Sequence, residues 1–288
     1  MSHRPTAVIE SVANPRLKNT LRLRKSRERR VSGLLLAEGR REVQRAYEAG
    51  LACHELWTCD ALLGETFSPE RDAVHWYTVS PAVLNKLAWH DEPEGMVGVF
   101  EAPRWSLASL SETRDGDLYL VAVGTEKPGN LGAMVRTAAA AGCRAVLAVC
   151  PSVDVFNPAA IRNSTAAVFS MPVVVVPEAT QALDWLAARG ISVVAAVSPG
   201  QGGGSCFETE WTFPAAITVG PEHAGLDAVW RERASALVTI PMFGHGEIEE
   251  VSDATCGAGS SVDSLNASAA AAVLLYEAVR RRGVAESP

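Results

Sequence analysis

The chain has 288 residues, of which 48% are hydrophobic and 6% aromatic, and its formal net charge at pH 7 is −7. A half-apolar chain of this length can bury one large or two modest cores, which excludes a wholly disordered protein. No apolar run reaches the roughly 18 residues that a membrane-spanning helix needs. The first residues lack the apolar stretch of a secretory signal, so we expect a cytoplasmic protein.

The basic residues are concentrated near the start of the chain. Residues 1–48 hold 12 Lys and Arg against 5 Asp and Glu, a balance of +7, whereas residues 49–288 hold 14 against 28, a balance of −14. A basic run with a single acid, Glu28, consists of Arg16, Lys18, Arg22, Arg24, Lys25, Arg27, Arg29 and Arg30. Such a run is typical either of a helix face in water or of a surface that binds a polyanion, and charge alone leaves both open.

The first hundred residues predict a small α/β domain. Asn14 and Pro15 have the pattern of a helix N-cap followed by Pro in the first turn, so we expect the basic run to be helical. Beyond it we expect strands over 34–37, 75–79 and 96–100 and helices over 39–48 and 81–87. A polar stretch over 106–117 predicts a linker, which places the first domain at residues 1–105.

From Leu118 onward, short apolar runs alternate with helical segments. The expected strands are 118–123, 145–150, 173–176, 192–197, 215–219 and 237–240. The expected helices are 131–141, 181–188, 226–233 and 266–282. Continuous apolar strands separated by helices predict a parallel sheet covered on both faces. We therefore expect a second α/β domain over 118–288.

The common nucleotide-binding motifs are missing from the predicted strand ends, where a doubly wound domain binds its cofactor. The turn at 124–132 lacks G-x-G-x-x-G, and the chain has no G-K-[ST]. The glycine run at 200–204 precedes no obvious helix, so we expect a flexible loop there. The cysteines and histidines show no metal-ligand spacing, and we expect no metal site.

Three segments at strand ends carry polar side chains instead. Arg136 lies in an otherwise apolar helix, six residues after Asn130, and must reach a partner, a ligand or water, because burying an unpaired charge is costly. Glu222 directly follows a predicted strand, and Ser264 and Asn266 begin the last helix. Each residue alone fits a cap, a turn or a surface position. Their occurrence together at strand ends indicates one polar site.

These segments resemble the motifs of the SpoU (TrmH-like) branch of the SPOUT superfamily. The matching residues are Asn130, Gly132, Arg136 and Ala138, then Gly220, Glu222 and Gly225, then Ile240-Pro241-Met242 and Ser264-Leu265-Asn266-Ala267-Ser268. Family members transfer a methyl group from S-adenosylmethionine to a ribose 2′-hydroxyl of RNA. The front half resembles the family's L30e-like substrate-binding domain at 14–18, 37–40 and 94–98. The resemblance implies that this half binds RNA through the basic run and Arg40.

The resemblance also implies a parallel sheet with a deep trefoil knot and a homodimer. It implies that the cofactor is held by Gly220, Ile240, Met242, Leu265 and Asn266. Arg136 occupies the catalytic position of the family. Because free Arg stays protonated, we expect it to clamp the neighbouring phosphate and orient the hydroxyl, with a phosphate oxygen or a strongly perturbed Arg136 accepting the proton. The residues expected to position the ribose and Arg136 are Asn130, Glu222, Ser264 and Asn266.

The chain departs from the family in one place. The family runs from the Pro-Met pair to the Ser-Leu-Asn triplet in about half a dozen residues, whereas here Phe243–Asp263 intervenes. We expect an insertion within 244–260, acting either as a lid beside the cofactor or as a neutral loop.

Family members with this two-domain layout mostly modify large-subunit ribosomal RNA, and some confer resistance to ribosome-targeting antibiotics. We therefore expect 2′-O-methylation of 23S ribosomal RNA. Transfer RNA is the nearest alternative substrate, because the motifs do not distinguish the two RNAs. A non-catalytic RNA-binding protein and an enzyme acting on a small metabolite are the alternatives from other classes.

Overall fold

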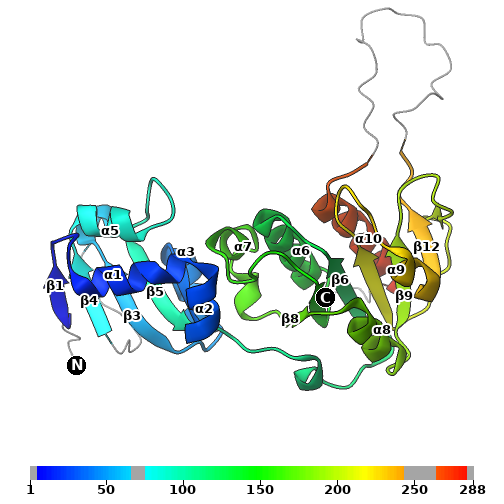
Figure 1. Ribbon diagram of the computed structural model, residues 1–288, viewed down its shortest axis with the longest axis horizontal. Coiled ribbons are helices and arrows are strands. Elements are labelled where there is room, and N and C mark those ends of the chain that lie inside the picture. Colours follow the sequence, from blue (N-terminus) through cyan, green and yellow to red (C-terminus); the bar gives the residue numbers. More distant parts are fainter. Residues whose placement is uncertain (1–4, 66–74, 243–263, 284–288) are drawn as a thin grey trace, which may run out of the picture. The chain divides into compact units, whose positions relative to one another are not determined.

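The computed structural model describes residues 5–65, 75–242 and 264–283 (Figure 1). The chain forms two compact units. The first contains residues 1–104 together with 154–170, and the second contains residues 105–153 together with 171–288. The predicted insertion at 244–260 lies outside the described residues.

The first unit is built on a five-stranded mixed sheet in the order β1-β4-β3-β5-β2. The strands are β1 (Ala7–Ile9), β2 (Leu34–Glu38), β3 (Cys53–Thr58), β4 (His75–Val79) and β5 (Met96–Glu101). β5 is antiparallel to β2 and β3, whereas β4 is parallel to β1 and β3. β1 and β3 are additional to the predicted strands. In β3, His54 and Glu55 interrupt the apolar run that would have indicated a strand.

Short helices accompany this sheet. They are α1 (Pro15–Leu21), η1 (Arg22–Arg24), α2 (Ser26–Ser32), α3 (Arg40–Glu48), α4 (Asp60–Leu63), α5 (Pro81–Leu87), α7 (Pro158–Asn163) and η3 (Ala167–Phe169). The Asn14 side chain caps α1 by accepting the backbone N–H of Arg16, as predicted. The basic run is helical but broken, because Lys25 is extended between η1 and α2. Leu17 and Leu23 of this run are buried in the core beside Trp57 of β3.

One member of the basic run lies inside the first unit. Arg29 is 4% exposed, and its guanidinium Nη2 and Nε lie 2.6 and 2.8 Å from Oδ2 of Asp154. Its Nη1 donates to the carbonyl oxygens of Leu23 and Arg24. Arg29 therefore fixes η1 and α2 to the segment that begins at Asp154.

We predict that Arg29→Ala destabilises the first unit, because it leaves a largely buried carboxylate without its cation. Breaking such a pair costs on the order of 3 kcal/mol. Urea denaturation of this variant should give a lower free energy of unfolding, whereas Arg30→Ala, which removes an exposed neighbour, should leave it nearly unchanged. Equal stability of the two variants would contradict this role of Arg29.

The second unit contains a seven-stranded sheet in the order β10-β12-β9-β11-β6-β7-β8. The strands are β6 (Leu118–Val123), β7 (Ala145–Val149), β8 (Val173–Val176), β9 (Ser192–Ala196), β10 (Gly204–Ser205), β11 (Ala215–Val219) and β12 (Ala236–Thr239). Every pairing is parallel. The predicted α/β class with a parallel sheet is confirmed. The glycine run at 200–204 was expected to be a loop, but its last residue enters the sheet as part of β10.

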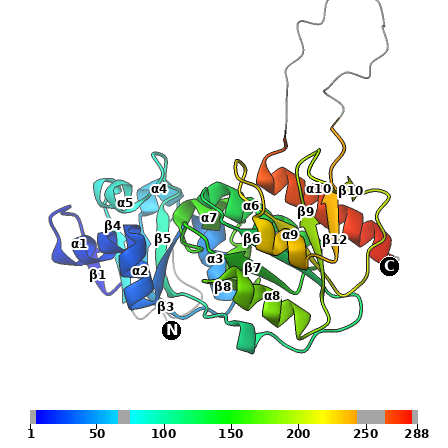
Figure 2. The same ribbon diagram turned by 45° about the vertical axis from the view of Figure 1, so that its right-hand side comes forward.

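Helices cover both faces of this sheet (Figure 2). α6 (Pro128–Ala140) packs against α10 (Ala267–Arg282), and both contact β6. α8 (Ala179–Ala187) packs against α9 (Ala228–Arg233), and both contact β9. Burial on both faces explains why the strands are apolar throughout. Within the described ranges, no helix combines the length and apolar character needed to cross a bilayer.

The predicted linker segment also lies in the second unit. Leu107–Ser109 forms the short helix η2, which Ser106 caps by accepting the backbone N–H of Ser109. Trp105 and Leu110 pack against the core of the second unit, and the indole of Trp185 donates to the carbonyl oxygen of Leu107. This segment is therefore attached to the sheet of the second unit along much of its length.

Candidate functional site

The order of the strands locates a site at the carboxyl edge of the parallel sheet. From β6 the chain proceeds outward through β7 and β8, and it then crosses to the other side of β6 to form β9 and β11. β6 and β11 are neighbours at this reversal. Loops that leave adjacent strands at such a switch point diverge and open a crevice, the usual ligand site of an open α/β sheet.

A carboxylate joins three segments at this point. Oε1 of Glu222, in the loop after β11, accepts hydrogen bonds from Nδ2 of Asn130 at 2.7 Å and from Nδ2 of Asn266 at 2.5 Å. Its Oε2 accepts a hydrogen bond from Nζ of Lys127 at 2.5 Å. Asn130 lies near the start of α6, and Asn266 is the N-cap of α10, where its Oδ1 accepts the backbone N–H of Ser268. We call Lys127, Asn130, Glu222 and Asn266 the Glu222 cluster.

The donors of this cluster stabilise the ionised form of Glu222. The hydrogen bond from Lys127 is the largest contribution that lowers the pKa of the Glu222 carboxyl, followed by the hydrogen bond from Asn130. An ionised carboxylate only accepts hydrogen bonds, so it orients both amide groups with their nitrogen atoms toward it. The carbonyl oxygen of Asn130 accepts a longer hydrogen bond from Nδ2 of Asn266 at 3.3 Å, and its second lone pair can accept from a further donor.

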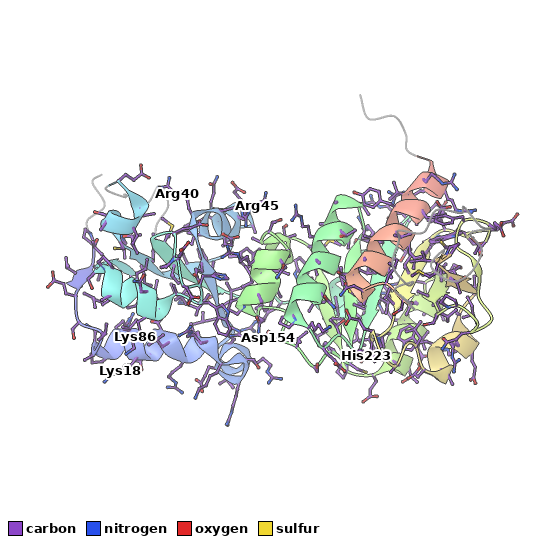
Figure 3. The ribbon with its side chains drawn as sticks, turned by 90° about the horizontal axis from the view of Figure 1, so that it is seen from above. Lys18, Arg40, Arg45, Lys86, Asp154 and His223 are labelled. Carbon is purple, nitrogen blue, oxygen red and sulfur yellow. The ribbon has the colours of Figure 1, made fainter. Side chains whose placement is uncertain are left out.

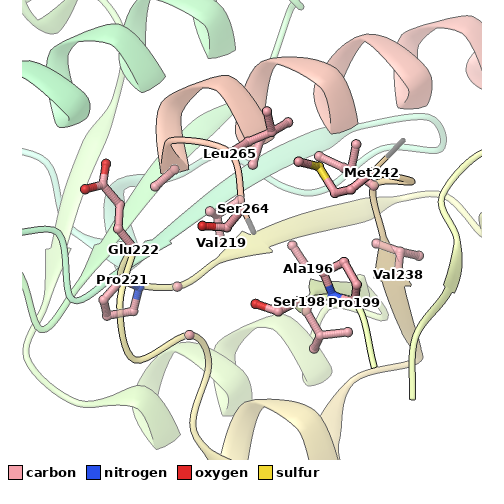
Figure 4. Close-up of a pocket in the computed structure, with 16 residues that line it drawn as sticks. Ala196, Ser198, Pro199, Val219, Pro221, Glu222, Val238, Met242, Ser264 and Leu265 are labelled. Atoms are coloured by element: carbon pink, nitrogen blue, oxygen red, sulfur yellow. The ribbon is translucent and has the colours of Figure 1, made fainter. Parts of the chain in front are cut away.

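A pocket adjoins the Glu222 cluster (Figure 4). It lies at the carboxyl ends of β9, β11 and β12 and at the start of α10. The predicted cofactor residues that line it are Gly220, Ile240, Met242 and Leu265. Ser264 and Glu222 also contribute to its wall. A second hollow, lined by Lys127, Asn130 and Glu222, shares Gly220 and Pro221 with it. The structure thus brings four of the five predicted cofactor residues into one pocket, with Asn266 in the adjoining cluster.

At Gly220, in the wall of this pocket, two stretches of backbone lie very close together. A Cβ atom at this position would lie 2.6 Å from the carbonyl carbon of Gly225 and 2.7 Å from the amide nitrogen of Leu226. Both are backbone atoms, so the loop would have to move to accommodate any side chain. Glycine therefore allows the loop after β11 to turn back closely on itself in the wall of the pocket.

Arg136 lies apart from the Glu222 cluster. It is exposed on α6 and belongs to neither of the two hollows described above. Six residues separate it from Asn130, which at 3.6 residues per turn turns its side chain roughly 120° away around the helix. From the sequence, Arg136 is expected to reach a partner, a ligand or water. In the described chain its side chain is exposed to water.

The predicted RNA-binding residues fall into two groups. Those exposed to solvent are Lys18, Arg22, Lys25, Arg27, Arg30 and Arg40. Lys18 and Lys86 project from α1 and α5, which pack together, whereas Arg40 lies on the other side of the first unit (Figure 3). Arg16, Arg24 and Arg29 are less accessible and are engaged with Glu55, with Trp89 and with Asp154, respectively. The basic run is therefore only partly available to a ligand.

One residue of the Glu222 cluster was not predicted. Lys127 lies in the turn between β6 and α6, and nothing in its sequence neighbourhood distinguishes it from an ordinary surface lysine. Its position three residues before Asn130 was the available signal, because both residues flank the first turn of the same helix.

Family models match both halves of the chain. The model of the SpoU rRNA Methylase family matches residues 117–256, and that of the MRM3-like substrate binding domain matches residues 14–98. A 23S rRNA (uridine(2479)-2′-O)-methyltransferase of Streptomyces viridochromogenes is 33% identical over 208 residues, which cover 71% of this chain and 67% of the relative. The chain belongs to the SpoU rRNA methylase family.

Solved structures of RNA methyltransferases have the same fold over nearly the whole chain. An RNA 2′-O ribose methyltransferase aligns with a TM-score of 0.76 and 38% identity, over 96% of this chain and 99% of that structure. An AdoMet-bound rRNA methyltransferase from Sinorhizobium meliloti aligns with a TM-score of 0.79 and 26% identity, over 95% and 98% of the two chains. The SpoU membership predicted from the motifs is confirmed.

We predict that Glu222 of this SpoU family member titrates below the ordinary value of 4.5, because the cluster favours its charged form. The resulting stabilisation is present above the pKa of the unfolded chain and is lost as the pH falls through the lower pKa of the folded state. A carbon-13 NMR titration of the Glu222 carboxyl should show this midpoint, and Lys127→Ala should raise it. A titration midpoint at or above 4.5 that is the same in the wild type and in Lys127→Ala would refute the lowered pKa of Glu222.

Proposed function

We propose that the protein transfers a methyl group from S-adenosylmethionine to a ribose 2′-hydroxyl of 23S ribosomal RNA. The observation that carries this proposal is the Glu222 cluster beside the pocket lined by Gly220 and Leu265, in a chain of the SpoU family. The similar enzyme of Streptomyces viridochromogenes is named for the same reaction on 23S rRNA. We assign RNA recognition to residues 1–105 and methyl transfer to residues 118–288, joined by 106–117.

The residues of the pocket fit S-adenosylmethionine. Val238, Ile240, Met242 and Leu265 provide apolar surface of the kind that covers a purine ring. The close turn at Gly220 shapes the loop after β11 that forms part of the pocket wall. When bound, the cofactor supplies a methyl group on a positively charged sulfur. The ionised Glu222 at the pocket wall favours a positive charge there.

The reaction requires the ribose oxygen to be aligned and its proton to be removed. In our proposal, the hydroxyl of Ser264 and the carbonyl oxygen of Asn130 position the ribose, and Glu222 keeps the two amides in place. The Asn130 oxygen already accepts from Nδ2 of Asn266 and can accept a second hydrogen bond. Arg136 donates two hydrogen bonds to the neighbouring phosphate and stabilises the developing negative charge. A phosphate oxygen then accepts the proton, because an exposed Arg holds its own proton at neutral pH.

A homodimer explains the separation of Arg136 from the Glu222 cluster. α6 and α10 pack together, and the residues that they expose include Arg136, Ala140, Ala269 and Tyr276, the last being 53% exposed. In our proposal these residues form one strip. Small and aromatic residues around a single charge suit burial against a second copy. We propose that this strip pairs the subunits and directs Arg136 to the pocket of the other one. The trefoil knot around the pocket also stays a proposal drawn from the family.

We predict that Arg136→Ala abolishes methyl transfer but leaves cofactor affinity nearly unchanged, because Arg136 does not line the pocket. Transfer from labelled S-adenosylmethionine and calorimetric binding measure the two effects separately. Arg231→Ala, which removes an exposed arginine from α9, is the matched control and should retain both activities. A parallel loss of cofactor binding in Arg136→Ala would contradict this division of roles.

We predict that replacing Lys18, Lys25 and Arg27 together by Ala weakens RNA binding and flattens its salt dependence. Each lost phosphate contact should reduce the slope of log affinity against log salt by about 0.7. All three side chains are exposed, so the fold should be retained. An unchanged slope, measured by filter binding at several salt concentrations, would show that the basic run is only solvated surface.

The substrate is tested by incubating the protein with labelled S-adenosylmethionine and total RNA, followed by mapping of the modified ribose. Label in 23S ribosomal RNA supports the proposal, and label in transfer RNA alone overturns it. An RNA-binding protein without catalytic activity would transfer no label. A cytoplasmic location follows from a ribosomal substrate. Resistance to a ribosome-targeting antibiotic stays a family-based prediction, to be tested on ribosomes carrying the modification.

A further inference from the structure

An exposed tryptophan stands beside the basic run of the first unit. Trp89 lies directly after α5 and is 44% exposed, although tryptophan usually buries most of its surface. A single exposed apolar residue requires no explanation by itself. The contacts around Trp89 are what distinguish it, since they fix its main chain and one face of its ring.

The main chain at Trp89 is held by a carboxylate. Oε2 of Glu38, the last residue of β2, accepts the backbone N–H of Trp89 at 2.6 Å, and its Oε1 accepts that of His90 at 3.2 Å. A charged acceptor makes both hydrogen bonds stronger than neutral ones. The loop is therefore anchored to the sheet at the residue that carries the indole.

The ring is held by a cation. The guanidinium carbon of Arg24 lies 5.2 Å from the centre of the Trp89 ring, and Nη2 of Arg24 donates to the carbonyl oxygen of Ala88 at 3.2 Å. Arg24 thus covers one face of the indole and is itself bound to the adjacent residue. The exposed part of the ring offers a flat surface that is already ordered, so little conformational freedom is lost when a planar ligand stacks on it.

The surrounding charges favour a base over a phosphate as that ligand. Asp91, Glu92 and Glu94 follow in the same loop and are exposed, so the loop after Trp89 carries negative charge that disfavours phosphate. Exposed lysines lie on the neighbouring elements instead: Lys25 follows Arg24, and Lys86 is in the last turn of α5. A strand of RNA can place its phosphates on these lysines and turn a base toward Trp89.

We propose that Trp89, backed by Arg24, is a stacking platform for an unpaired base of the substrate RNA, outside the ribose that is methylated. This inference rests on the proposed function for the identity of the RNA. A base inside a duplex is already stacked on its neighbours, so the platform selects a loop, a bulge or a single-stranded segment. Stacking tolerates any base, and the platform therefore recognises an unpaired state and not a sequence.

The test measures binding of an oligoadenylate of about 12 nucleotides, long enough for a single-strand site, by fluorescence anisotropy at several salt concentrations. Trp89→Ala should lower the affinity about 5- to 100-fold without changing the salt slope, because stacking involves no counterion release. Trp89→Phe should recover much of the affinity. Phe207→Ala, which removes a 49% exposed aromatic ring from the second unit, should have no effect. Unchanged thermal unfolding of each variant confirms that the fold is retained.

An RNA duplex of the same length separates the platform from general charge attraction. Its affinity should not depend on Trp89. Three results would each overturn the platform. They are equal binding of oligoadenylate by the wild type and Trp89→Ala, a smaller salt slope of the affinity in Trp89→Ala, and no binding by the wild type. Methyl transfer to ribosomal RNA is measured in parallel. If transfer is absent but oligoadenylate binding still depends on Trp89, the proposed function fails and the platform stands.

Discussion

The candidate site depends on one carboxylate. Glu222 receives hydrogen bonds from Lys127 and Asn130 at the start of α6 and from Asn266 at the start of α10. The start of α6, the loop after β11 and the start of α10 are far apart in the sequence, yet this carboxylate joins them. A carboxylate that accepts from three donors holds the segments in one arrangement, most strongly while it is ionised. The shape of the neighbouring pocket follows from this arrangement, since Gly220 and Leu265 belong to the same loops.

The parallel sheet explains why the polar residues gather there. Helices cover both faces of the seven-stranded sheet, so its strands carry almost no polar side chain that a ligand could reach. Chemistry is confined to the strand ends, and the reversal of strand order beside β6 opens the loops at that edge. The first unit differs, because its mixed sheet bears short helices rich in Arg and Lys. This difference supports our proposal that cofactor chemistry and RNA contact belong to different units of the chain.

Much of this organisation was predictable where one physical signal dominated. Six of the seven strands of the second unit were predicted because burial makes them continuously apolar, whereas β10 (Gly204–Ser205) carries no apolar run and was not predicted. β3 was missed because His54 and Glu55 interrupt its pattern. Asn130, Glu222 and Asn266 were predicted to form one site from motif order, and the structure joins them directly. Arg29 shows the limit of charge counting, since spacing along the chain does not reveal which member of a basic run is buried. A knot depends on how the chain threads, which no local pattern encodes.

The most direct measurement maps methylated riboses in 23S ribosomal RNA after incubation with S-adenosylmethionine and either the wild type or Glu222→Ala. If the Glu222 carboxylate organises the site, the wild type modifies a ribose 2′-hydroxyl at a defined nucleotide. The variant leaves that nucleotide unmodified while its first unit still binds RNA. Methylation of a base, or full ribose methylation by Glu222→Ala, would contradict the account.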